Sequence, residues 1–138
     1  MSLLSPYSQY RQTQAETASQ SKLLLMLHAG AVRFLRQAKA SMAEQDYYNQ
    51  GQNVNKALAI ITHLNGSLCP DKGGEIATNL QSIYTYLSSR ITLANLKDDP
   101  KPLDEAIEHL RTIGDALQEA QSAAAASSKQ PQDACLAA

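Results

Sequence analysis

The sequence has little of what many protein classes require. Its 138 residues include no tryptophan, one phenylalanine and two cysteines, and only 5% of the chain is aromatic. Sandwiches and barrels need clusters of β-branched and aromatic residues in alternation, and no such cluster is present. A chain of this length most often forms one domain. The composition therefore favours a single domain of helices packed through leucine and alanine.

An excess of charge of one sign is also missing. Twelve basic and thirteen acidic residues leave a formal net charge of −1, which gives no electrostatic attraction for nucleic acid. No stretch approaches the roughly 20 apolar residues of a membrane span. The first residues lack both the basic and the apolar region of a signal peptide. We therefore expect a cytoplasmic protein that binds no nucleic acid and does not insert into membranes.

Cysteine and histidine are too few and too scattered for a disulfide framework or a metal centre. Cys69 precedes a proline and Cys135 lies in a polar tail, so we expect both to be incidental, in keeping with a cytoplasmic protein. His28, His63 and His109 fall on three predicted helices without a ligand partner four residues away, and we place them on the surface or rim. No nucleophile motif is present either. We expect no enzyme activity, metal or cofactor.

Four stretches carry apolar residues at the three- and four-residue spacing of an amphipathic helix. The predicted helices cover residues 20–44, 47–68, 75–97 and 101–121. Ser19 and Asp99 are the expected N-caps of the first and last. The breaks between the helices lie at Gln45-Asp46, at Pro70 with Gly73-Gly74, and at Asp98 to Pro102. Because these connections are short, the sequence predicts an all-α, antiparallel four-helix bundle.

Both ends of the chain differ from the predicted bundle. Residues 1–18 are rich in serine, glutamine and tyrosine, and we expect a flexible N-terminal arm with at most a short helix. Residues 122–138 have no apolar period and contain Pro131, which predicts a disordered C-terminal tail. The bundle domain is therefore expected to cover residues 19–121.

The predicted helices carry more apolar residues than one face of a bundle helix needs. In the third helix, Ile76, Ile83 and Leu87 are expected to face the core, and an adjoining face contains Ala77, Tyr84 and Leu93. Either these wide faces pack against several neighbours, or they form a groove that accepts an amphipathic peptide. A bundle that holds a metal needs inward-facing glutamate and histidine three residues apart, and the apolar stripes contain none.

Several motifs occur in an order that resembles one known family. Thr17-Ala18-Ser19 precedes a helix with Leu23, Met26-Leu27 and Gly30. Later motifs follow at Leu64-Asn65-Gly66-Ser67-Leu68, Gly74-Glu75-Ile76-Ala77, Tyr84-Thr85-Tyr86-Leu87 and Ala94-Asn95. Over about residues 7 to 117 the chain is similar to the flagellar secretion chaperone family, FliS. It departs from that family at Gln20, where many members have proline, and at Leu117, where tryptophan is common.

The resemblance implies a cytoplasmic export chaperone. Such a protein binds the disordered C-terminal segment of flagellin, prevents premature polymerisation and assists delivery to the flagellar type III export apparatus. The flagellar export gate and other flagellar regulators are further partners that the resemblance allows. The client-binding residues that it implies are Tyr10, Leu64, Asn65, Leu68, Leu80, Tyr84, Leu87 and Asn95. Tyr7 and Tyr10 either belong to an arm that covers the groove or pack on the end of the bundle.

A self-associating structural bundle, or an adaptor without a flagellin client, is the alternative hypothesis. In that case the surplus apolar face contacts further copies of the chain. A chaperone is expected to be a monomer or a weak dimer and to bind one client chain. The dependence of molecular mass on concentration separates the two hypotheses.

Overall fold

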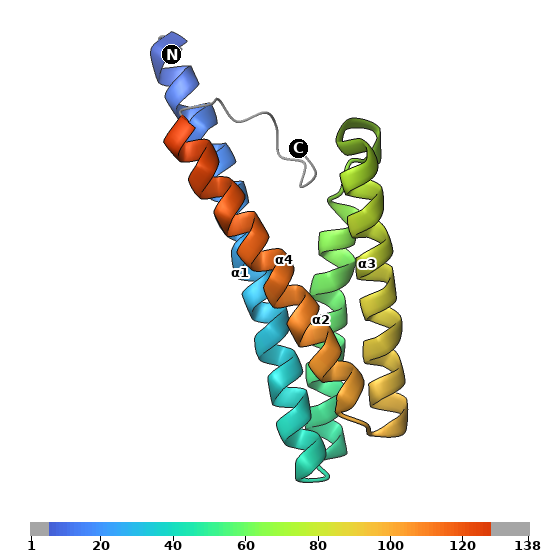
Figure 1. Ribbon diagram of the computed structural model, residues 1–138. Coiled ribbons are helices and arrows are strands. Elements are labelled where there is room, and N and C mark those ends of the chain that lie inside the picture. The colour runs from blue at the N-terminus through green and yellow to red at the C-terminus, as the bar shows by residue number, and fades with distance from the viewer. Residues whose placement is uncertain (1–5, 128–138) are drawn as a thin grey trace.

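The computed structural model describes residues 6–127, with side chains from residue 19 to residue 124. These residues form four helices and no strand, which confirms the all-α prediction: α1 (Pro6–Ala43), α2 (Tyr47–Gly66), α3 (Pro70–Lys97) and α4 (Lys101–Ser127). The short connections 44–46, 67–69 and 98–100 make consecutive helices antiparallel. α1 and α3 each pack against both α2 and α4. The fold is the predicted four-helix bundle (Figure 1).

Capping side chains and left-handed residues define the helix ends at the predicted breaks. Gln45 and Asp98, just after α1 and α3, have φ values of 58° and 52°. The Asp46 carboxylate accepts a hydrogen bond from the backbone N–H of Asn49 at 3.2 Å. The Asp99 carboxylate accepts one from the backbone N–H of the first residue of α4 at 3.0 Å. Asp99 thus caps α4, as its position predicts.

α1 and α4 are longer than predicted. α1 begins at Pro6 rather than at Ser19, because no glycine or proline lies between them and glutamine, alanine and glutamate favour helix. α4 continues past residue 121 to Ser127. It does so through four consecutive alanines, and alanine favours helix even without an apolar period. The remaining parts of the predicted arm and tail, residues 1–5 and 128–138, lie outside the described residues.

α3 also begins earlier than predicted, but with a kink. Pro70 occupies its first turn, and Gly74 then adopts φ 58° and ψ −129°, outside the helical region. Regular helical geometry therefore starts at residue 75, where the apolar period predicts the helix to begin.

The core combines one apolar stripe from each helix. Leu35, Ile61, Ile91 and Leu110, one from each of α1 to α4, are fully buried. Burial of such a side chain contributes about 1.5–3 kcal/mol relative to leaving it in water. The four stripes form one continuous hydrophobic cluster along the bundle axis.

The buried face of α3 differs from the predicted one by a rotation of the helix. Ile76 is 61% exposed, so the expectation that it faces the core is wrong. Ala77 and Tyr84, expected on an adjoining face, are fully buried together with Leu87. The reason is that Ala77, Tyr84 and Leu87 share a stripe with Ile91 and Ala94, and this longer stripe decides the orientation of the helix.

The two halves of the bundle separate toward one end. In Figure 1, α1 with α4 and α2 with α3 lie close together near the α1–α2 connection and diverge toward the α2–α3 connection. Within the α1–α4 pair, the Gln121 side chain donates a hydrogen bond to the carbonyl of Ser21 at 2.9 Å. We call this region the divergent end and define it as residues 19–28, 64–68, 76–84 and 113–121.

The α2–α3 connection contains Cys69, which is disulfide-bonded. The expectation that both cysteines are incidental is therefore wrong for Cys69, and Cys135 lies outside the described residues. Separation along the sequence could not decide this point, because a disulfide depends on the distance between the two residues in the fold. Cysteine usage consequently gives no support for a cytoplasmic location.

Candidate functional site

Large apolar side chains are exposed on both sides of the divergent end. Leu23 and Met26 on α1 are 46% and 61% exposed, and Ile76 on α3 is 61% exposed. Other apolar residues nearby are only partly buried against the core: Leu24, Leu27, Leu80, Ile83, Ile113 and Leu117. The divergent end therefore offers apolar contact area from α1, α3 and α4 to a partner.

A buried polar pair links α1 to α3 across the interior of the bundle. Nε2 of His28 lies 2.7 Å from the Tyr84 hydroxyl, and Nδ1 lies 2.8 Å from the carbonyl of Leu24. A carbonyl only accepts, so Nδ1 carries the proton, and Nε2 of the neutral ring accepts from Tyr84. The pair therefore holds together two helices that are diagonal neighbours in the bundle.

The location of His28 corrects a prediction. Its exposed fraction is 2%, whereas we expected a histidine on the surface or rim. The sequence does contain the signal, since His28 stands in the same stripe as Leu24, Ala31 and Leu35, at spacings of four, three and four. Burial lowers the pKa of the His28 imidazole, and the hydrogen bond to Leu24 opposes this shift. Burial also raises the pKa of the Tyr84 phenol.

The apolar residues predicted to contact a client lie together along α2 and α3. Leu64, Tyr84 and Leu87 are fully buried, and Leu68 is 8% exposed. Leu80 is half-buried at the edge of the core. In this conformation they belong to the core or to its edge. Their contact with a client stays a prediction.

Asn65 has an acceptor without a partner. Its side-chain amide donates to the Thr85 hydroxyl at 3.4 Å, which links α2 to α3. Its Oδ1 atom is buried and forms no hydrogen bond within the described part of the chain. An unpaired buried acceptor is costly, so a donor that reached this oxygen would be stabilised.

Asn95 lies at the opposite end of the bundle from the other predicted contact residues. Its Oδ1 accepts a hydrogen bond at 3.0 Å from Nε2 of Gln50, which also donates to Asp98 at 2.8 Å. Because Gln50 is buried, this network joins the start of α2 to the end of α3. Tyr7 and Tyr10 belong to α1, but their side chains lie outside the described set.

Two kinds of site are absent from the described residues. Between residues 6 and 127, no group of three histidine, cysteine, aspartate or glutamate side chains is arranged to hold a metal ion. None of the described helices is both long and apolar enough to cross a membrane. Contact through apolar side chains is the property that the divergent end supplies.

Comparisons with known proteins place these features in one family. The family model of the flagellar protein FliS matches residues 3–124. The flagellar secretion chaperone FliS of Vibrio cholerae is 41% identical over 104 residues, which cover 75% of this chain and 76% of the relative. That of Bacillus subtilis is 31% identical over 120 residues, covering 87% and 89%. That of Salmonella typhimurium is 37% identical over 101 residues, covering 72% and 75%.

These relatives are chaperones and not enzymes, which confirms the expectation that the chain has no catalytic activity. The family match covers most of the chain, and the helical bundle agrees with the fold that the resemblance implied. The chain therefore belongs to the FliS family of flagellar secretion chaperones.

Proposed function

We propose that the protein is a cytoplasmic export chaperone that binds the disordered C-terminal segment of flagellin at the divergent end. It keeps that segment from polymerising prematurely and delivers it to the flagellar type III export apparatus. The observation that carries the proposal is the exposure of Leu23, Met26 and Ile76 on opposite sides of this end. Family membership supports the export role.

The divergent end suits a client that folds as it binds. Methionine adapts its shape to irregular apolar surfaces, and Met26, at 61% exposed, is more exposed than Leu23. A disordered segment that becomes helical on contact buries a large area at modest affinity per unit area, which permits later release. A client backbone N–H group could pair with the unsatisfied Oδ1 of Asn65 only after a local rearrangement that uncovers this buried atom.

Calorimetric titration of the full chain with a peptide from a flagellin C-terminus tests the proposal. We expect saturable one-to-one binding with a strongly negative heat-capacity change, because apolar surface leaves water. Absence of heat and of a complex across several temperatures would contradict the proposal.

Single substitutions can locate the binding surface without damage to the core. Leu64 is fully buried, so a charge there would unfold the bundle and report nothing about binding. Met26→Ser and Ile76→Ser change exposed positions and should each weaken the peptide about tenfold through lost apolar burial. Leu96→Ser is the matched control, since Leu96 is 78% exposed at the opposite end of α3. Equal weakening by all three variants would contradict this location.

Self-association is the competing function for the same exposed side chains. Sedimentation of the chain alone, at several concentrations, measures it directly. A mass that stays at one chain over the range used for titration is expected of the proposed chaperone. A mass that rises with concentration, together with no peptide binding, favours the structural subunit.

A further inference from the structure

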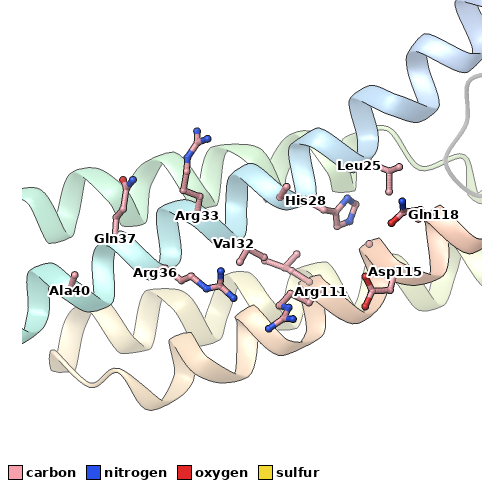
Figure 2. A pocket seen from close by; sticks show the side chains of 13 residues that line it. Leu25, His28, Val32, Arg33, Arg36, Gln37, Ala40, Arg111, Asp115 and Gln118 are labelled. Carbon is pink, nitrogen blue, oxygen red and sulfur yellow. The ribbon is translucent and has the colours of Figure 1, made fainter.

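A concave surface runs along α1 and α4, on the outside of the bundle. It is a groove of about 690 Å³ whose walls include Leu25 and Val32 from α1 and Gly114 and Asp115 from α4. Figure 2 shows the two helices side by side, with Val32 of α1 and Arg111 of α4 between them. Val32 and Leu23 are nine residues apart on α1, which is about two and a half turns, so they lie on opposite sides of the helix. The groove therefore faces away from Leu23. Its lining residues up to His28 and from Gly114 onward fall within the divergent end, whereas Arg36 and Arg111 lie outside it.

The dimensions and floor of the groove fit a helix. Leu25 and Ala40 mark its ends on α1, and the distance between them along the helix is about 22 Å, or four turns. Val32 is 7% exposed and forms part of an apolar floor. Ala29 carries only a methyl group, so another backbone can approach closely here. Gly114 faces α1, since a Cβ atom added to it would lie 3.7 Å from Cβ of His28.

Two arginines enter the groove from opposite walls without counter-ions. Figure 2 shows Arg36 of α1 and Arg111 of α4 extending toward the same stretch, whereas Arg33 points away. In the part of the chain that the structure describes, neither Arg36 nor Arg111 has a carboxylate within 4.0 Å, and neither donates a hydrogen bond. Asp115, which also lines the groove, is not within that distance.

The neighbouring cations behave differently. Lys39 on α1 pairs with Asp104 on α4, and Arg90 on α3 pairs with Glu105 on α4 at 2.8 Å. Lys39 and Arg90 thus each have a carboxylate partner. The guanidinium groups of Arg36 and Arg111 have none among the described residues and face one another. A carboxylate placed between them would relieve their repulsion and accept charge-assisted, bidentate hydrogen bonds.

We propose that the α1–α4 groove is a second docking site, for a helical segment of a partner protein. That segment has an apolar stripe against Leu25 and Val32 and an aspartate or glutamate seated between Arg36 and Arg111. Its flank beyond α4 is not acidic, because Glu108 and Asp115 line the adjoining hollow and would repel it. The site goes beyond the proposed function, since the Arg36–Arg111 pair lies outside the divergent end and selects an acidic partner by charge.

The test uses the full chain and a labelled synthetic peptide, followed by fluorescence anisotropy. The peptide is a helix of roughly fifteen residues with a leucine stripe and one central glutamate on its edge. A second peptide has lysine in place of that glutamate. We expect the glutamate peptide to bind the wild type, and R36E/R111E to bind it more weakly by about tenfold or more. The lysine peptide should prefer R36E/R111E over the wild type.

Two further variants make the result specific. R36Q/R111Q removes the charges without reversing them and should weaken the glutamate peptide to an intermediate degree. K97E/K101E makes the same change in net charge at the α3–α4 connection, where both lysines are exposed, and should leave binding unchanged. Equal binding of both peptides by every variant, or no binding of the glutamate peptide by the wild type, would overturn the proposal.

The same variant separates the arginine pair from the proposed client site. We expect R36E/R111E to bind a flagellin C-terminal peptide with wild-type affinity, because neither arginine belongs to the divergent end. Loss of flagellin binding in R36E/R111E would show that the arginine pair is part of the client site and would overturn the proposal.

Discussion

At the scale of single residues, the His28–Tyr84 pair is the feature with the most to test. It places two polar groups in an apolar interior, at a hydrogen-bond distance of 2.7 Å. Such a pair adds little net stability while it is intact, but removal of one partner leaves the other unsatisfied. The cost of breaking it is therefore larger than the benefit of having it.

Replacement of Tyr84 by phenylalanine should lower the free energy of unfolding by about 1–3 kcal/mol, because Nε2 of His28 loses its only donor among the described residues. Urea denaturation measures the change. Tyr86→Phe is the control: Tyr86 is 46% exposed and donates to Glu105 at 2.8 Å, so water can replace that bond. A loss in Tyr86→Phe as large as in Tyr84→Phe would contradict the argument.

Acidification should destabilise the protein through His28. Burial lowers the pKa of this imidazole in the folded state, so below about pH 6.5 the unfolded chain binds a proton that the folded chain does not. The free energy of unfolding then falls with decreasing pH, by at most about 1.4 kcal/mol per pH unit from this group.

The free energy of unfolding is measured by denaturation at several pH values, from neutral pH down to the lowered pKa of His28 in the folded state. His28→Gln keeps hydrogen-bonding atoms but does not titrate, so this part of the pH dependence should disappear. His63→Gln and His109→Gln change exposed histidines and should keep the wild-type slope. A slope that survives in His28→Gln would assign the pH dependence to other groups.

Residue-level features were only partly predictable. The leucine stripes were readable because they repeat over many turns, and burial of Leu35, Ile61 and Leu110 follows from them. The burial of His28 was not predicted, because a histidine is usually expected at the surface. Its position in the apolar stripe with Leu24, Ala31 and Leu35 indicates the interior instead. Ile76 was misplaced because a kink at Gly74 cuts it off from the preceding turn, and the rotation of α3 is decided by residues further along.

At the scale of helices, we expect opposite effects from the same substitution at two glycines, one at the kink of α3 and one inside α2. Gly74→Ala forces a side chain into φ 58°, a region that residues other than glycine avoid, and should destabilise the bundle by about 1–3 kcal/mol. Gly51→Ala lies in the interior of α2 with no atom within 4 Å of the added methyl group, and should stabilise it by about 0.5–1 kcal/mol. Thermal denaturation of both variants measures the signs. The same sign in both would show that the backbone geometry at residue 74 does not matter.

Helices were better predicted than their ends. The four helices and their connections follow from apolar period and from breakers such as Pro70. The start of α1 and the end of α4 did not follow, because helix propensity alone extends a helix where no packing is required. The disulfide at Cys69 depends on distances in the fold, which spacing along the chain does not contain.

At the scale of the whole molecule, the divergence of the two helix pairs affects how the native state opens. Amides near Leu35 and Ile91 lie in the closely packed half, whereas those before His28 and after Ile113 lie where the pairs separate. We expect amide hydrogens of the second group to exchange by local opening, and those of the first only with global unfolding. Hydrogen exchange followed by mass spectrometry measures both classes, and equal protection throughout would contradict the expectation.

The same difference in packing along the bundle gives its two ends different roles. We expect the closely packed half to keep its fold without a partner, and the divergent end to open at a lower free-energy cost than global unfolding. A partner that binds at the divergent end could then adjust the helices there without disturbing the closely packed half.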